Sequence, residues 1–186
     1  VHMDRLFIGV LLSISAVAYY TTPYEVVIKL LVIPAAIAGV AFPRFAHLHG
    51  SENNQLTAMR ATYQKSLIYT SVLVLPVFAI ILGAPLFLKL WLDEAFVQQS
   101  SLVMQILSIG VLVNGLAHIP YALIQGIGKP HITATLHIIE LLIYIPLLLI
   151  FIKHFGLNGA ASAWLIRVII DAILLFYLSH QELYHH

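Results

Sequence analysis

The sequence predicts an all-α bundle of helices embedded in a membrane, and three observations predict it. Hydrophobic residues make up 61% of the 186 residues and charged residues only 9%, whereas soluble domains carry about 25% charged residues. The apolar residues gather in segments near the roughly 20 residues that a helix needs to cross a bilayer. These segments lack the in–out alternation of membrane β-strands. A lipid environment also favours helices, because their backbone hydrogen bonds close internally.

We expect about six membrane-spanning helices within residues 4–180. We interpret residues 1–3 as a remnant of cloning and residues 181–186 as a polar tail. The first span is short and begins abruptly, which predicts that the chain is part of a longer protein. The predicted spans cover residues 4–20, 24–42, 67–91, 102–127, 132–151 and 157–178.

Charged residues and helix breakers set the boundaries of these spans. The second span ends at Pro43-Arg44, ahead of a polar stretch at residues 47–55. An amphipathic lead-in at residues 56–66 precedes the third span, in which Pro76 predicts a kink. The later spans end, in chain order, at Asp93-Glu94, at Gly128-Lys129-Pro130 and at residues 153–156.

Lysine and arginine near the ends of the spans predict the orientation, because they concentrate on the cytoplasmic side. If the first span begins in the cytoplasm, only Lys89 and Lys153 lie at external ends. The bases on the cytoplasmic side are then Arg5, Arg44, Arg60, Lys65 and Lys129. We therefore expect both ends of the chain in the cytoplasm, with Tyr19-Tyr20 in the external aromatic belt.

Ionisable residues inside the spans predict the functional site, because such residues usually face a bundle interior or a wet cavity. Glu25 and Lys29 have the i,i+4 spacing of a helical ion pair. Either this pair neutralises itself near the external interface, or Lys29 helps to hold an anionic substrate. Arg167 and Asp171 repeat the spacing in the reverse order near the middle of the last span. That pair is either structural or faces a cavity.

Two further polar pairs lie in the fourth and fifth spans. Glu140 follows His137 by three residues and shares its helix face. Such a pair can bind a metal, couple transport to a cation or proton, or form an interior hydrogen bond. We expect no metal, because the motif has no third ligand. His118, one turn after Asn114, either hydrogen-bonds at the Pro120 kink or contacts substrate.

Several chemistries are excluded by the sequence. No cysteine is present, so disulfides and thiolate metal sites cannot form, and the net charge of +1 argues against nucleic acid. The sequence holds no P-loop, no Asp-rich diphosphate motif, no His-Glu-x-x-His and no Gly-x-Ser-x-Gly. We therefore expect a transporter without a cofactor, and not an enzyme.

A series of motifs in a fixed order resembles the second half of bacterial polysaccharide flippases, within the multidrug/oligosaccharidyl-lipid/polysaccharide exporter superfamily. The resemblance runs from Asp4 to about Leu178. The motifs are Asp4-Arg5-Leu6-Phe7-Ile8-Gly9, Tyr19-Tyr20, Pro23-Tyr24-Glu25, Pro34, Phe42-Pro43-Arg44, Gly126-x-Gly128-Lys129-Pro130 and Gly156-Leu157-Asn158-Gly159-Ala160-Ala161.

The resemblance implies two six-helix bundles around a central cavity, of which this chain is similar to the second. It implies alternating-access transport of undecaprenyl-diphosphate-linked oligosaccharide across the bacterial inner membrane. The expected partners are membrane lipid, the lipid-linked oligosaccharide, a proton or sodium ion, and the missing N-terminal bundle of the same protein.

The resemblance assigns Lys29 to the diphosphate and Asp4 to ion coupling. Our hypothesis adds Arg167 and Arg5 to the diphosphate site, Asn114 and His118 to the sugars, and Glu140, Asp171 and Glu25 to ion coupling. Pro34 is expected to give the second helix a bend that a rocking bundle can use. The alternatives are a cation-coupled drug antiporter, a membrane enzyme acting on polyprenyl carriers, and a bundle with a purely structural role.

Overall fold

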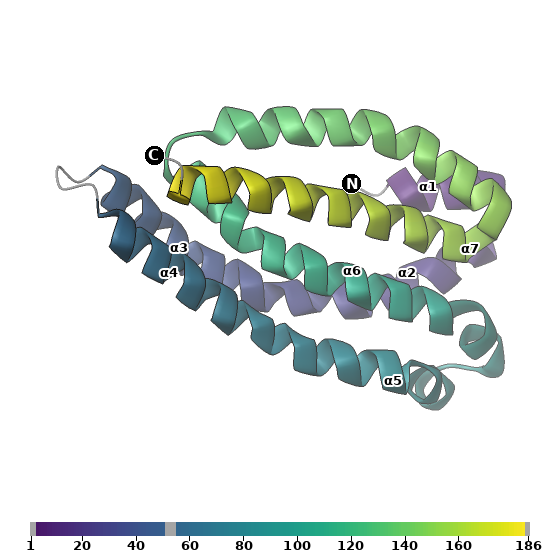
Figure 1. The fold of residues 1–186 in the computed structure, drawn as a ribbon. Helices are drawn as coiled ribbons and strands as arrows, with labels where there is room; N and C mark the ends of the chain where they lie inside the picture. Colours follow the sequence, from purple (N-terminus) through teal and green to yellow (C-terminus); the bar gives the residue numbers. More distant parts are fainter. Residues whose placement is uncertain (1–2, 51–54, 185–186) are drawn as a thin grey trace.

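The computed structural model describes residues 3–50 and 55–184, and every element in these ranges is helical. Figure 1 shows long rods that lie roughly side by side. The α-helices are α1 (Met3–Leu11), α2 (Ile14–Ile28), α3 (Val32–His49), α4 (Leu56–Thr70), α5 (Val74–Trp91), α6 (Glu94–Gly126) and α7 (Pro130–Tyr184). The prediction of an all-α fold is confirmed.

Two short 3₁₀ turns join helices into longer rods. The turn η1 (Lys29–Leu31) joins α2 to α3, and the turn η2 (Ser71–Leu73) joins α4 to α5. Each turn ends three residues before a proline, Pro34 or Pro76. A proline has no N–H to donate, and its ring clashes with the carbonyl four residues earlier. These prolines therefore disturb the helices for one turn without ending them.

Within the described ranges, four helical rods are long and apolar enough to cross a membrane: Ile14–His49, Leu56–Trp91, Glu94–Gly126 and Pro130–Tyr184. The expected number of about six spans is therefore not confirmed. Helix α1 has nine residues, which at about 1.5 Å per residue gives about 14 Å. That length is too short for a hydrocarbon core of about 30 Å.

The first helix break lies at residues 12–13, and not between residues 20 and 24 as the sequence analysis predicts. Ser13 has extended backbone, and its hydroxyl accepts a hydrogen bond from the Ala16 N–H at 3.0 Å. This N-cap satisfies a free donor at the start of α2. Helix α2 then continues through Pro23. The predicted boundary was wrong because Ser13 caps α2 and so starts a new helix at residue 14, whereas Pro23 lies inside that helix without ending it.

Helix α7 folds back at Gly156, so that its two arms, residues 130–155 and 157–184, lie side by side (Figure 1). Gly156 has φ 58° and ψ −133°, a conformation that residues with a Cβ rarely adopt. A boundary between two spans is expected at this glycine from the sequence. The last rod therefore consists of two antiparallel arms joined by a glycine turn.

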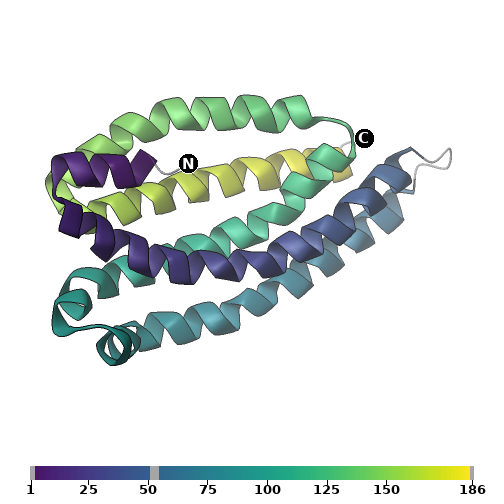
Figure 2. The ribbon, with the colours of Figure 1, turned by 180° about the vertical axis from the view of Figure 1, so that it is seen from behind.

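Helix α6 forms the core of the bundle, between the arms of α7 and the rods that contain α3 and α4 (Figure 2). In its most apolar stretch of 18 residues, 50% of the residues are buried, against 17–28% in the corresponding stretches of the other three rods. Small residues allow this close packing. Gly110 lies under the ring of Trp164, and Gly115 lies against Leu73 and Pro34.

Large apolar side chains cover the outside of the bundle. Ile14, Leu75, Leu90 and Leu142 are each 69–88% exposed. A surface of this kind is unfavourable in water over so large an area, and favourable against lipid acyl chains. The long apolar rods and this surface together indicate a multi-pass membrane protein.

Candidate functional site

The two arms of α7 bring four ionisable side chains together: His137, Glu140, Arg167 and Asp171. We call them the interior charged cluster. His137 Nδ1 lies 3.5 Å from Glu140 Oε2 and 3.8 Å from Asp171 Oδ1. Arg167 Nε lies 3.6 Å from the same Glu140 oxygen. One carboxylate from each arm therefore faces the same imidazole.

Helical spacing and the turn at Gly156 create this cluster. Residues three or four apart share a helix face, which groups His137 with Glu140 and Arg167 with Asp171. The glycine turn then sets the two faces opposite each other. Of the two alternatives for Arg167 and Asp171, the structural pair is not seen, because Arg167 pairs with Glu140 of the other arm. A base that precedes an acid is the weaker order within one helix, and the fold offers a better partner.

Five polar atoms of the cluster are buried and have unused hydrogen-bonding capacity, while the side chains of His137 and Arg167 are 40% and 31% exposed. Glu140 is 5% exposed and Asp171 is 8% exposed. Both Glu140 oxygens, Asp171 Oδ1, His137 Nδ1 and Arg167 Nε have no hydrogen-bond partner among the described residues. Their separations exceed the about 2.7–3.2 Å of a protein hydrogen bond. Buried carboxylates in this state are suited to accept a proton or a cation.

One imidazole nitrogen and two carboxylate oxygens of the cluster could hold such a cation. Atoms of His137, Glu140 and Asp171 lie within 4.8 Å of one another. With a neutral imidazole, two carboxylates and one guanidinium carry a formal charge of −1. One proton or one monovalent cation would neutralise this charge. Asp171 was expected to take part in ion coupling, but local spacing could not place it beside His137 and Glu140, because it comes from the other arm. The expectation that this motif lacks a third ligand is therefore wrong.

Cavities border the cluster on two sides. A cavity of about 200 Å³ is lined by Asn114, His118 and Tyr121 of α6 together with His137 and Asp171. The structure therefore brings both predicted sugar-contacting residues beside the cluster. His118 Nδ1 donates a hydrogen bond to the Asn114 backbone carbonyl at 2.8 Å. This bond agrees with the alternative in which His118 hydrogen-bonds within the helix near Pro120. A second cavity of about 400 Å³ is lined by Leu141, Tyr144 and Arg167, among others, and again by His137.

The predicted residues of the N-terminal segment form a second polar group. The buried Asp4 carboxylate accepts hydrogen bonds from the Tyr20 hydroxyl at 2.9 Å and from the Arg5 backbone N–H at 3.0 Å. Arg5 forms an ion pair with Glu25 at 2.5 Å. The alternative in which Glu25 and Lys29 neutralise each other is therefore not seen, because α1 packs along α2 and brings a guanidinium to Glu25.

Tyrosine rings line the region between the two polar groups. The Arg5 guanidinium lies 5.1 Å from the centre of the Tyr24 ring, and the Arg167 guanidinium lies 5.4 Å from the centre of the Tyr144 ring. Contacts of this type attract a cation to the face of a ring. Neither ring could be assigned to a site from the sequence, since a tyrosine in an apolar segment carries no signal of its own. It also expected Tyr20 at the membrane interface, whereas Tyr20 is fully buried.

Lys29 belongs to neither group, although Glu25 precedes it by one helical turn. It begins the 3₁₀ turn η1, its side chain is exposed, and no described residue forms an ion pair or hydrogen bond with that side chain. It is the sixteenth of the 36 residues in the rod Ile14–His49. A cation so far from either end of an apolar rod is costly against lipid. This face of the rod therefore requires water, a counter-ion or another protein segment.

Comparisons with known proteins agree with a membrane transporter. A sequence model of the family described as "Polysaccharide biosynthesis protein" matches residues 1–101. The chain is 38% identical over 179 residues to a Shigella flexneri protein described as "Putative O-antigen transporter". That match covers 96% of this chain and 42% of the relative, so the chain spans less than half of the relative's length. No solved structure matches the chain.

Proposed function

The chain belongs to the polysaccharide biosynthesis protein family, a family of polysaccharide flippases, and from this premise we propose that it forms half of a lipid-linked oligosaccharide flippase. In this proposal it moves a polyprenyl-diphosphate-linked oligosaccharide across the bacterial inner membrane by alternating access. It acts as a transporter and not as an enzyme.

The interior charged cluster is the observation that carries this proposal. Buried, incompletely paired carboxylates are costly in an apolar bundle, and ionisable groups at such depth mark ion or proton pathways. Glu140 and Asp171 lie beside His137, which lines cavities of about 200 and 400 Å³. We propose that a proton or a sodium ion neutralises these carboxylates during each transport cycle, with Asp4 and Glu25 contributing from the second polar group.

Lys29 is proposed to meet the diphosphate of the substrate. The exposed ammonium lies deep along its rod, where attraction to an anion is stronger than in water. Arg5 and Arg167 are proposed as additional cations, and Asn114 and His118 as sugar contacts. The face that carries Lys29 would line the cavity opposite a second helix bundle. Both chain ends are proposed to lie in the cytoplasm.

The experiment that tests the substrate site replaces Lys29 in cells that require this protein for surface polysaccharide. Lys29→Ala should lower surface polysaccharide about tenfold or more, since a hydrogen bond to a charged group contributes about 1.5–3 kcal/mol. Lys29→Arg should retain most of the output. The control is Lys89→Ala, which removes an exposed lysine near the end of α5. Normal output from Lys29→Ala at normal protein level would exclude Lys29 from transport.

Ion coupling is tested by Glu140→Gln, which removes the charge and keeps the side-chain shape. Transport into vesicles should lose its response to an imposed sodium or proton gradient. Glu94→Gln is the matched control, because Glu94 is exposed at the start of α6. If Glu140→Gln responds to both gradients as the wild type does, the cluster has no part in coupling.

A further inference from the structure

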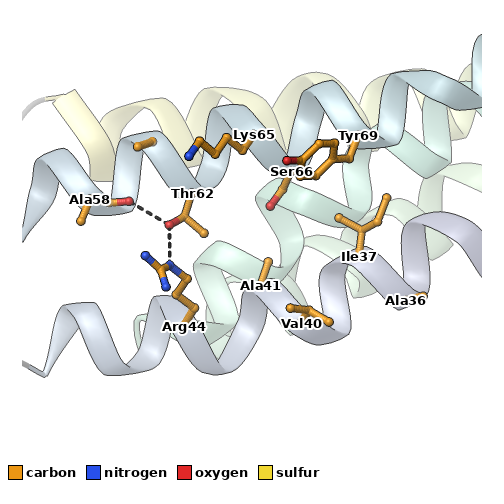
Figure 3. Close-up of a pocket in the computed structure, with 11 residues that line it drawn as sticks. Ala36, Ile37, Val40, Ala41, Arg44, Ala58, Thr62, Lys65, Ser66 and Tyr69 are labelled. Atoms are coloured by element: carbon orange, nitrogen blue, oxygen red, sulfur yellow. Dashed lines mark hydrogen bonds between the residues drawn. The ribbon is translucent and has the colours of Figure 1, made fainter.

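A groove between α3 and α4 carries two cations, Arg44 and Lys65, that the proposed transport site does not use. It has a volume of about 800 Å³ and is drawn in Figure 3. Four alanines leave room between the helices, and none of the described residues that line it is acidic. Its lining residues are Ala36, Ile37, Val40, Ala41, Arg44, Ala58, Ala61, Thr62, Lys65, Ser66 and Tyr69.

Arg44 is held in position across the groove. Its Nε donates a hydrogen bond to Thr62 Oγ1 at 2.9 Å, and the Thr62 hydroxyl donates to the Ala58 carbonyl at 2.8 Å (Figure 3). The two terminal amino groups of Arg44 have no hydrogen bond or ion pair with any described residue. The same holds for the Lys65 ammonium within the described ranges. The groove therefore offers a guanidinium fork and an ammonium to a ligand from outside.

Neighbouring cations at the same end of the bundle are used internally. Arg60 donates from Nε to the Leu183 carbonyl at 2.8 Å. Lys129 donates to both Glu182 oxygens, at 2.6 and 2.8 Å. These contacts tie the last arm of α7 to α4 and to the turn after α6. Arg44 and Lys65 differ from them in facing a groove without a carboxylate.

The position of the groove along the rods matches the levels of a lipid's headgroup and acyl chains in a bilayer. The rods Ile14–His49 and Leu56–Trp91 have 36 residues each, which gives about 54 Å and leaves about 12 Å beyond each side of a 30 Å core. Arg44 then lies about 8 Å from its rod end, at headgroup level. Lys65 lies about 14 Å from its rod end, just inside the hydrocarbon boundary, from which a long lysine side chain reaches the headgroups. Ala36 and Tyr69 lie about 20 Å from those ends, within the hydrocarbon.

We infer that this groove binds an anionic diacyl phospholipid, with the phosphate between Arg44 and Lys65 and one acyl chain along Ile37 and Val40. Basic pockets between membrane helices bind anionic headgroups in this way. Two cations and no carboxylate favour a net negative headgroup, since no anionic side chain in the lining would pair with the ammonium group of a zwitterion. Helix α6 separates the groove from the interior charged cluster, which favours a resident lipid over the transported substrate.

The test uses the purified 186-residue chain, delipidated in detergent, with phosphatidylglycerol and phosphatidylcholine of identical acyl chains. Native mass spectrometry should show phosphatidylglycerol binding about tenfold more tightly than phosphatidylcholine. The double variant Arg44→Ala/Lys65→Ala should bind both lipids equally, and Lys89→Ala should behave as the wild type. Ala61→Phe, which fills the groove and keeps both cations, should also lower phosphatidylglycerol binding about tenfold. Circular dichroism checks that each variant is folded.

Several outcomes would overturn the inference. Equal binding of the two lipids by the wild type, or a preference that survives the double variant, would exclude a headgroup site at Arg44 and Lys65. Unchanged binding by Ala61→Phe would show that surface charge alone attracts the lipid. Displacement of phosphatidylglycerol by millimolar inorganic phosphate, or by a lower concentration of polyprenyl diphosphate, would assign the groove to another phosphate ligand.

Discussion

Gly156→Ala is expected to destabilise the bundle through backbone strain alone. A Cβ added at Gly156 would meet no atom within 4 Å, so the substitution creates no clash. The backbone, however, has φ 58° and ψ −133°, a combination that costs a residue with a Cβ about 1–3 kcal/mol. We therefore expect a loss of about 2 kcal/mol in the free energy of unfolding, because the hairpin of α7 requires this turn.

Gly39→Ala is the matched control. A Cβ at Gly39 also meets nothing within 4 Å, but Gly39 lies inside α3 with ordinary helical backbone. Alanine should stabilise a helix interior by about 0.5–1 kcal/mol relative to glycine. Unfolding in detergent by increasing dodecyl sulfate, followed by circular dichroism, measures both variants. If the two alanines shift the midpoint in the same direction by the same amount, the strain argument for Gly156 is wrong.

Two further substitutions test contacts of the core. Tyr20→Phe removes the hydroxyl that donates to the buried Asp4 carboxylate, and should cost about 1–2 kcal/mol in the same unfolding assay; an unchanged midpoint would mean that Asp4 does not depend on this donor. Gly110→Val puts a side chain where the Trp164 ring packs and should cost about 1–3 kcal/mol by overpacking. The tryptophan emission should shift with it, and an unaltered spectrum and midpoint would contradict the packing of α6 against α7.

The membrane class could be read from the sequence, but the exact rods could not. Apolar runs identify spans because each residue contributes its own transfer free energy to lipid. The boundaries of helices depend on smaller free-energy contributions, such as helix caps and prolines, that compete with one another. Ser13 caps α2 and ends the first segment early, and Pro23 and Pro34 are accommodated within one rod. The breaks at Asp93, at residues 127–129 and at Gly156, in contrast, coincide with boundaries expected from the sequence.

For the candidate site too, some groupings of residues could be predicted from the sequence and others could not. Local spacing groups His137 with Glu140, and Asn114 with His118, on shared helix faces. It also suggests, as one alternative each, the pairs Glu25 with Lys29 and Arg167 with Asp171, and neither pair is seen. Their real partners, Arg5 and Glu140, are about 20–30 residues away along the chain, beyond the reach of helical periodicity.

Hydropathy and helical spacing act locally, so the amino-acid sequence is enough to specify a bundle of apolar helices with charged residues inside the spans. The tertiary structure alone decided which charges meet. The packing of α1 on α2 joins Arg5 to Glu25, and the turn at Gly156 sets Asp171 opposite His137. Ionic contacts over a few ångströms depend on how distant helices pack, and no local pattern contains that information.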